Sequence, residues 1–396
     1  MNPTARLLAI LALFGVTRAA AFAIPFGGTG YPLGHLVIND VTLYGQWSDL
    51  LAAGYFPADD PMWQYPPLAA PLFLLGRLWP RYDIGFMSVA LLADIAALVA
   101  LLVTAQRRGI WGGAWLWAGA AGIVGPVFLT RFDVFPTAAV MLALLVSHRS
   151  AISGALIGVA TALKVWPLLA LAAMRRSQLP AALSAAAAVL LGTTLILLFI
   201  YRSQALSFLN GQVERGLQIE SVAGAPFVVA HALGAQLNVP FRYGSMELDV
   251  PGAGLAGALA TGIGVLLLGW LAVLRLRGRL DSVPGPDVAF TAVLVSVVAS
   301  RVFSPQYSIW LLGLAAVCLA TPHTRMRWPA ALICAAAVLT QAIYPPLYTE
   351  LINGEAFASA LQVTRVALVV AACVLAIGSI VRRIRISPGQ QQRQPV

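Results

Sequence analysis

Residues 180–201 read PAALSAAAAVLLGTTLILLFIY and contain no charged side chain. A helix needs roughly 20 apolar residues to cross the hydrocarbon core of a bilayer, so this stretch predicts a membrane-spanning helix. Similar stretches recur along the whole chain, of which 60% is hydrophobic and 10% charged, whereas soluble domains carry about a quarter charged residues. The sequence therefore predicts an all-α polytopic membrane protein, with 1–396 forming a single integral membrane domain.

The predicted spans are distributed over most of the sequence. They lie at about 5–24, 84–105, 111–129, 132–147, 180–201, 252–274, 286–302, 306–320, 328–344 and 361–381. Between 152 and 174, Lys164 and Pro167 interrupt the apolar pattern, and such residues are tolerated at membrane depth only beside protein or a cavity. Two short broken helices fit this segment, which gives about 12 membrane helices.

Arginines lie in short clusters between the apolar stretches. Cytoplasmic loops of membrane proteins carry an excess of Lys and Arg. We therefore place these clusters on the cytoplasmic side of a plasma membrane, with both termini cytoplasmic. This bias accounts for the formal net charge of +10, so nucleic acid is not an expected partner. The first apolar stretch could also be a signal peptide, but Arg18 interrupts that pattern and we expect an uncleaved helix.

Two large segments then lie outside the membrane, where we expect the active site. The first extracytoplasmic loop, 25–83, is too long for a simple connector and should be structured, with juxtamembrane helices; the second is 202–251. In the first, the spacing of Val41, Tyr44 and Trp47 predicts an amphipathic helix. Asp40 could be its N-cap or a general base that accepts a proton from a sugar hydroxyl.

Further ionisable residues lie at the outer ends of the predicted spans. Arg131 and Asp133, in TRFD, could pair with each other, or could bind phosphate and sugar hydroxyls respectively. Lys164 is the only lysine and should face a polar cavity or snorkel outward. Arg301 breaks the positive-inside bias, so it either clamps the phosphate of a bound lipid or contacts ordinary headgroups.

The segment RGLQIES, 215–221, concentrates polar residues and could be either part of a site or a solvated surface helix. The complete set of candidate substrate-binding residues is Tyr44, Tyr65, Arg131, Asp133, Lys164, Arg215, Gln218, Glu220, Arg301, Ser304, Gln306 and Tyr307. No metal site is expected, because the four histidines and three cysteines have no ligand spacing. Asp59 and Asp60 are adjacent carboxylates that could hold a divalent cation, although ordinary turn residues are the simpler interpretation.

Several segments together resemble a known family. DVTLYGQW, GYFPADD before YPPL, TRFD, LKVWP, RGLQIES and SPQYSIWLL are similar to the polyprenyl-phosphate-mannose-dependent mannosyltransferases of actinobacterial type, in the GT-C superfamily. The resemblance covers about 30–345. It implies a GT-C-type multi-helix bundle that transfers mannose, with inversion, from a polyprenyl-phosphate donor to a glycolipid or lipoglycan acceptor. It also implies that Asp40 is the catalytic base and that no cofactor is needed.

Other functions remain open from the sequence. A secondary transporter or lipid flippase is the main alternative, but transporters usually contain paired internal repeats, and only one broken segment is visible. An inactive accessory membrane protein is a third possibility. Within the enzyme class, arabinose or glucose could replace mannose, because no motif identifies the configuration of the sugar hydroxyls.

Overall fold

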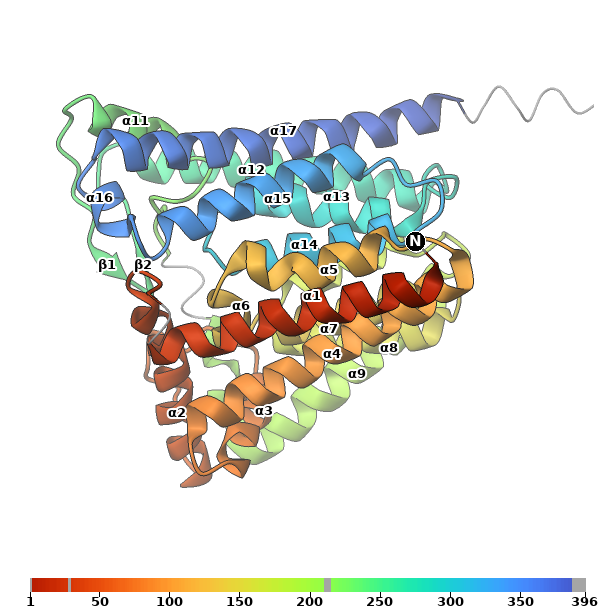
Figure 1. Ribbon diagram of the computed structural model, residues 1–396, viewed down its shortest axis with the longest axis horizontal. Helices are drawn as coiled ribbons and strands as arrows, with labels where there is room; N and C mark the ends of the chain where they lie inside the picture. The colour runs from red at the N-terminus through yellow and green to blue at the C-terminus, as the bar shows by residue number, and fades with distance from the viewer. Residues whose placement is uncertain (1, 28–29, 210–214, 387–396) are drawn as a thin grey trace, which may run out of the picture.

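The protein is described here by a computed structural model that covers residues 2–27, 30–209 and 215–386. The described part is mostly helical (Figure 1). Its α-helices are α1 (Pro3–Ala23), α2 (Asn39–Ala52), α3 (Ala69–Leu75), α4 (Tyr82–Arg108), α5 (Gly112–Val124), α6 (Val127–Thr130), α7 (Val134–Leu145), α8 (Ser150–Leu163), α9 (Leu179–Tyr201), α11 (Ala225–Ala232), α12 (Ala253–Leu276), α13 (Gly285–Val298), α14 (Tyr307–Leu319), α15 (Arg327–Ile343), α16 (Tyr348–Ile352) and α17 (Ala356–Ile386). Its 3-10 helices are η1 (Ile24–Phe26), η2 (Gly34–Ile38), η3 (Gly76–Leu78), η4 (Trp166–Ala173) and η5 (Arg202–Leu209).

A helix coincides with each predicted span. Among the described residues, five helical segments are long and apolar enough to cross a membrane, and they contain α1, α4, α9, α12 and α17. Shorter apolar helices, such as α5, α7, α13 and α14, lie between them. The predicted helical architecture is therefore confirmed except for one short β-hairpin among the residues described, and the apolar helices suit a membrane protein. The number of helices that cross the bilayer stays a prediction.

The long helices α9 and α12 expose apolar side chains along much of their length. On α9, Leu191 and Phe199 are 64% and 89% exposed, and on α12, Leu255 and Leu266 are 66% and 75% exposed. Large exposed apolar surfaces are unstable in water and natural in lipid. These faces are the expected lipid-facing sides of the bundle.

Small residues bring α8 and α9 into close contact. A Cβ atom added to Gly154 would lie 2.1 Å from the carbonyl oxygen of Ala182, and one added to Gly158 would lie 2.8 Å from that of Ala186. Both pairs are spaced by four residues, the small-xxx-small pattern that lets membrane helices approach. The chain then breaks at Lys164, which has an extended backbone, before η4 begins.

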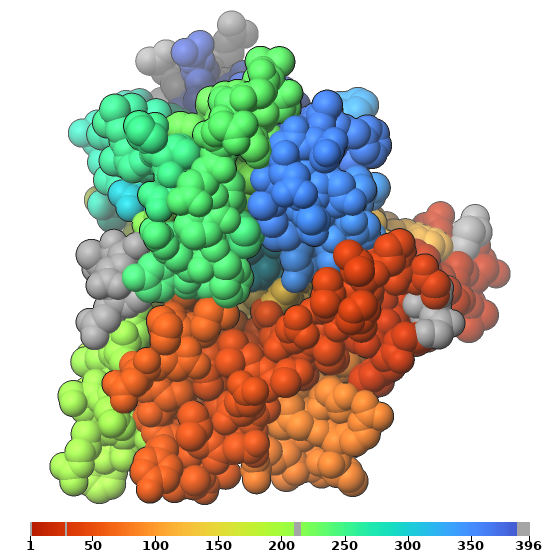
Figure 2. Space-filling view, turned by 90° about the vertical axis from the view of Figure 1, so that its left-hand side faces the viewer, coloured from red at the N-terminus to blue at the C-terminus, as the bar shows by residue number. Residues whose placement is uncertain are grey.

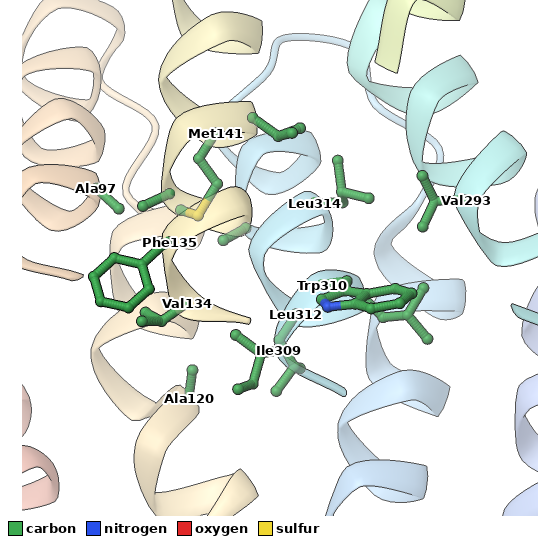
Figure 3. Close-up of a cluster of buried hydrophobic side chains, with 14 of the residues drawn as sticks. Ala97, Ala120, Val134, Phe135, Met141, Val293, Ile309, Trp310, Leu312 and Leu314 are labelled. Atoms are coloured by element: carbon green, nitrogen blue, oxygen red, sulfur yellow. The ribbon is translucent and has the colours of Figure 1, made fainter. Parts of the chain in front are cut away.

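The centre of the bundle is a continuous apolar core. Figure 3 shows side chains of α7 and α14 in this core, with Phe135 of α7 directed toward Ala97 of α4. Met141 and Leu314 are fully buried in the same cluster. Trp310, at the start of α14, is 5% exposed and marks the end of the core that faces the candidate site.

One ion pair is buried inside the bundle. Arg18 of α1 binds both carboxylate oxygens of Asp94 on α4, at 2.8 and 3.0 Å, and also donates to the carbonyl oxygens of Trp117 and Ala118 on α5. A buried charge is tolerated when it is paired and hydrogen-bonded. Arg18, which interrupts the first apolar stretch, therefore joins three helices.

The elements predicted to lie outside the membrane gather at one end of the bundle, on the left in Figure 1. Segment 30–80 forms η2, α2, α3 and η3 there, and the segment after 215 contributes α11 and a hairpin of β1 (Phe241–Arg242) and β2 (Ser245–Met246). The strands are antiparallel, with Phe241 opposite Met246. Figure 2 shows this end, where the orange-red segment meets the green and blue ones.

Candidate active site

A cavity of about 430 Å³ lies where these extramembrane elements meet the bundle. Eight residues predicted from the sequence line it: Asp40, Tyr44, Tyr65, Lys164, Arg215, Ser304, Gln306 and Tyr307. They come from α2, the segment before α3, the break between α8 and η4, the loop after η5, and the start of α14. The structure thus brings together segments that are far apart in the sequence.

Asp40 lies in the first turn of α2, and its side chain is 33% exposed. It is not the N-cap: the helix begins at Asn39, and no side chain caps it. The Asp40 carboxylate instead forms an ion pair, through Oδ2, with Nη1 of the buried Arg131. Arg131 also donates to the hydroxyl of Tyr344 at 3.0 Å. Arg131 therefore fixes the orientation of Asp40 at the cavity wall.

The predicted salt bridge between Arg131 and Asp133 is wrong. Asp133 pairs with Lys164, whose Nζ lies 2.6 Å from Asp133 Oδ1, and Trp310 Nε1 donates to the same oxygen at 2.5 Å. The side chains of Arg131 and Asp133 find different partners because Arg131 has an extended backbone, whereas Asp133 is the N-cap residue of α7. Asp133 is 1% exposed, so it positions Lys164 from behind the cavity surface.

Aromatic rings surround the ammonium group of Lys164. Its Nζ lies 5.1 Å from the ring centroid of Trp310 and 5.7 Å from that of Tyr65. Trp310 in turn stacks on Tyr307 and Trp166, with centroid separations of 3.8 and 5.0 Å. An ammonium over aromatic faces is stabilised by cation–π attraction, and flat rings suit the apolar faces of sugars.

Two tyrosines form the wall beside α2. The hydroxyls of Tyr44 and Tyr65 are 2.9 Å apart, and burial raises the pKa of both phenols. They therefore remain protonated and can donate hydrogen bonds. Trp47, one turn further along α2, donates to Asp60 Oδ2 at 2.8 Å, while Asp60 Oδ1 accepts from the Met62 amide. Asp60 thus holds the loop against α2.

Arg215 supplies a second cation to the cavity. It donates to the carbonyl oxygen of Tyr243 at 3.2 Å, and its Nε is buried without a hydrogen-bond partner among the described residues. None of the salt bridges between described residues involves it. Its charge is therefore available to an anionic ligand.

One side of the cavity is apolar. Phe208 and Leu209 of η5 line it together with Leu43 and Val165. Leu209 and Val165 are more than half exposed, at 52% and 57%. The η5 part of this wall comes directly after α9 in the chain, and α9 exposes apolar side chains. A hydrocarbon chain in the bilayer could therefore reach the cavity along this wall.

Gln218 and Glu220 do not line the cavity; they belong to a buried network behind it. Glu220 accepts hydrogen bonds from Gln218 Nε2 at 2.6 Å and from the Tyr348 hydroxyl at 2.9 Å, and Arg365 of α17 forms an ion pair with it at 3.4 Å. Both residues are buried, so the interpretation of this segment as a solvated helix is wrong. Gln218 Oε1 accepts from the Phe303 amide, which supports the turn that carries Ser304 and Gln306.

Arg301 also lies away from the main cavity. It lines a second one, of about 180 Å³, beside Gly257 of α12 and Asp249. Its Nη1 donates to the carbonyl oxygen of Arg215 at 3.2 Å. Arg301 thus supports the backbone of Arg215, while Lys164 and Arg215 are the basic residues that line the main cavity.

Some cavity residues were not predicted. Three of them are Gln64, Trp166 and Trp310. Trp310 lies one helical turn after Tyr307, and Trp166 lies two residues after Lys164, so these spacings could have identified both tryptophans. Tyr243 and Gly244, at the tip of the β1–β2 hairpin, also line the cavity. They lie outside all the recognised segments, and only the fold brings them there.

One expectation from the sequence concerns metals. In the described parts of the chain, no group of three His, Cys, Asp or Glu residues is arranged to hold a metal ion. The expectation that no metal assists stays a prediction.

No curated protein and no solved structure matches the chain. A family model does match, over residues 63–305, and it is that of glycosyltransferase family 87. Since this match covers more than half of the sequence, the chain belongs to glycosyltransferase family 87.

Proposed function

We propose that this glycosyltransferase transfers a sugar, mannose or a related one, from a polyprenyl-phosphate donor to a glycolipid or lipoglycan acceptor with inversion. The observation that carries the proposal is the meeting of Asp40, Lys164 and Arg215 in one cavity at the end of a membrane bundle. A carboxylate can remove a proton from an acceptor hydroxyl. Two cations can stabilise the phosphate that leaves.

The reaction we propose is a single displacement at the anomeric carbon. The acceptor oxygen forms the new bond while its proton passes to Asp40. The bond between the anomeric carbon and the phosphate oxygen breaks, and its electron pair leaves with polyprenyl phosphate. Arg131 pairs with the Asp40 carboxylate, and this carboxylate is the proposed base.

The charges around the cavity favour an anionic donor. The Asp40 and Asp133 carboxylates are each paired with a cation, whereas Arg215 forms no salt bridge with a described residue and interacts at longer range with the Glu247 carboxylate. Arginine can bind two phosphate oxygens at once. Lys164 uses one of its three donors on Asp133, so the others remain for phosphate or sugar oxygens. The apolar wall of Phe208 and Leu209 suits the start of a prenyl chain.

The proposed sugar and acceptor are those that the resemblance of the sequence segments implies. Mannose is the sugar implied by the segments around Asp40, Asp133 and Lys164, and a glycolipid or lipoglycan is the implied acceptor. Tyr44, Tyr65 and Gln306 line the cavity and are the proposed contacts for sugar hydroxyls. The arginine clusters favour a plasma-membrane protein with cytoplasmic termini and an active site on the outer face.

The test is transfer of label by the purified protein in lipid nanodiscs. Radiolabelled polyprenyl-phosphate mannose and extracted glycolipids are supplied to the unmodified protein, to Asp40→Asn and to Asp59→Asn. Asp59 is a carboxylate of the same loop that does not line the cavity, so it is the matched control. We expect label in a lipid acceptor with the unmodified protein and Asp59→Asn, and none with Asp40→Asn.

Two results would contradict the proposal. Full activity of a folded Asp40→Asn protein would exclude Asp40 as the base. Absence of transfer from every polyprenyl-phosphate sugar, with broad acceptors and a folded protein, would exclude this donor class. Glucose and arabinose donors are tested in parallel to identify the sugar.

A further inference from the structure

Another cavity, separate from the two already described, lies at the opposite end of the bundle. This is the end on the right in Figure 1, where α17 ends. The cavity has a volume of about 420 Å³, close to that of the candidate active site. It is formed by the end of α4 and by the connections from α7 to α8, η4 to α9, α12 to α13 and α14 to α15. No residue of the proposed transfer reaction belongs to it.

This cavity is strongly basic. Arg108, Arg175 and Arg383 line it together with His148 and His323. Asp281 is the one carboxylate among its lining residues in the described chain, and it is already engaged by Arg275, whose Nη1 lies 2.8 Å away. The three lining arginines therefore leave a net positive charge inside the cavity.

Two of the three lining arginines are held by neutral carbonyl oxygens. Arg383 donates through Nε to the carbonyl oxygen of Ser282 at 2.9 Å and through Nη1 to that of His323 at 3.0 Å. Arg108 donates to the carbonyl oxygen of Ala320 at 3.3 Å. Over residues 2–27, 30–209 and 215–386, no carboxylate lies within salt-bridge distance of Arg108, Arg175 or Arg383.

Neutral carbonyl acceptors hold a guanidinium in place but leave its charge for another ligand. Arg108 and Arg175 are exposed and Arg383 is half-buried, so the like charges around the cavity are reachable from solvent, and a bound anion would offset their mutual repulsion. Several guanidinium groups around one concave site are the usual means of binding phosphate, since each can donate two parallel hydrogen bonds.

We propose that this cavity binds a phosphate group, presented either by an anionic lipid headgroup or by a soluble phosphorylated molecule. By the positive-inside bias, this end of the bundle faces the cytoplasm. The site therefore lies on the membrane side opposite to the transfer reaction. The proposal is independent of the proposed function, because it concerns binding alone.

The test compares two neighbouring arginines. Arg175 lines the cavity, and its guanidinium has no partner among the described residues, so Arg175→Gln should fold normally. Arg176 follows it, is also exposed, and does not line the cavity, so Arg176→Gln is the matched control. Binding of inorganic pyrophosphate is measured by calorimetry in phosphatidylcholine nanodiscs at constant ionic strength. The thermal unfolding midpoint is measured in the same nanodiscs and in ones where phosphatidylglycerol replaces part of the phosphatidylcholine.

The two arms distinguish the sources of phosphate. Pyrophosphate binding that Arg175→Gln weakens about tenfold, and Arg176→Gln does not, supports a soluble ligand. A rise in the unfolding midpoint with phosphatidylglycerol that only Arg175→Gln abolishes supports a lipid headgroup. No response to either probe, or an equal loss in both variants, would overturn the proposal, because surface charge alone would then explain the arginines.

Discussion

Lys164 Nζ lies 2.6 Å from Asp133 Oδ1, and this contact joins the break after α8 to the start of α7. Trp310 Nε1 donates to the same oxygen, which adds α14 to the junction. Asp133 is 1% exposed and the Lys164 side chain is 22% exposed. The carboxylate is thus the buried anchor, and the ammonium is the part presented to the cavity.

Lys164→Met should destabilise the protein by about 3–5 kcal/mol, because it leaves the Asp133 carboxylate buried without its cation. The double variant Lys164→Met, Asp133→Asn should recover most of that stability, while transfer activity stays low in both. Thermal unfolding in nanodiscs measures the first effect, and the label assay measures the second. Recovery of activity together with stability would show that Lys164 serves only to pair with Asp133.

Arg215→Gln should lower kcat about 100- to 1,000-fold, because it removes a donor aimed at charge that develops in the transition state. Arg301→Gln is the comparison, since Arg301 lines the smaller cavity and contacts the Arg215 carbonyl oxygen. It should retain most of its kcat. A larger loss in Arg301→Gln than in Arg215→Gln would restore Arg301 as the phosphate clamp.

The helices could be predicted from the sequence because apolar stretches of spanning length have few alternatives in a folded protein. Residues 180–201 coincide with α9 almost throughout. The break at Lys164 was also visible, because a charge and a proline interrupt an apolar run. The pairing of Arg18 with Asp94 was not visible in the sequence. Each residue is a single charge in an apolar stretch, and only the packing of α1 on α4 brings the two together.

The candidate site was predictable where its residues lie at the outer ends of helices. Asp40, Lys164 and Tyr307 are of this kind. Glu220 and Arg301 also lie in outer segments, yet their side chains face a buried network and a smaller cavity. Position along the chain predicts the end of the bundle at which a residue lies, whereas the direction of its side chain depends on loop conformation. The hairpin residue Tyr243 was missed for the same reason.

Gly154→Ala should destabilise the bundle by about 1–3 kcal/mol, since overpacking forces neighbouring groups apart. The added Cβ atom would lie 2.1 Å from the Ala182 carbonyl oxygen, and backbone atoms of α9 cannot move independently. Gly192→Ala on α9 is the control, because a Cβ atom added to Gly192 would meet no described atom within 4 Å. Equal thermal unfolding midpoints for the two variants would show that α8 and α9 are not in close contact.

The stability of the Glu220 network should depend on pH. Burial, opposed by Arg365 and by the Tyr348 hydrogen bond, raises the pKa of Glu220. The folded state therefore favours the protonated carboxyl, and its contribution to stability is full below the unfolded pKa and is lost as pH rises through the folded value. In Glu220→Gln the side chain is neutral at every pH, so this loss is absent.

The measurable quantity is the difference in unfolding midpoint between Glu220→Gln and the unmodified protein. The ion pair with Arg365 exists only while Glu220 is ionised, so its loss in the variant is part of this pH-dependent difference. The difference should therefore become more favourable to the variant between mildly acidic and neutral pH. Asp59→Asn, a change in another loop, should show no such trend. A difference that moves the other way would mean that Arg365 outweighs burial and holds Glu220 ionised.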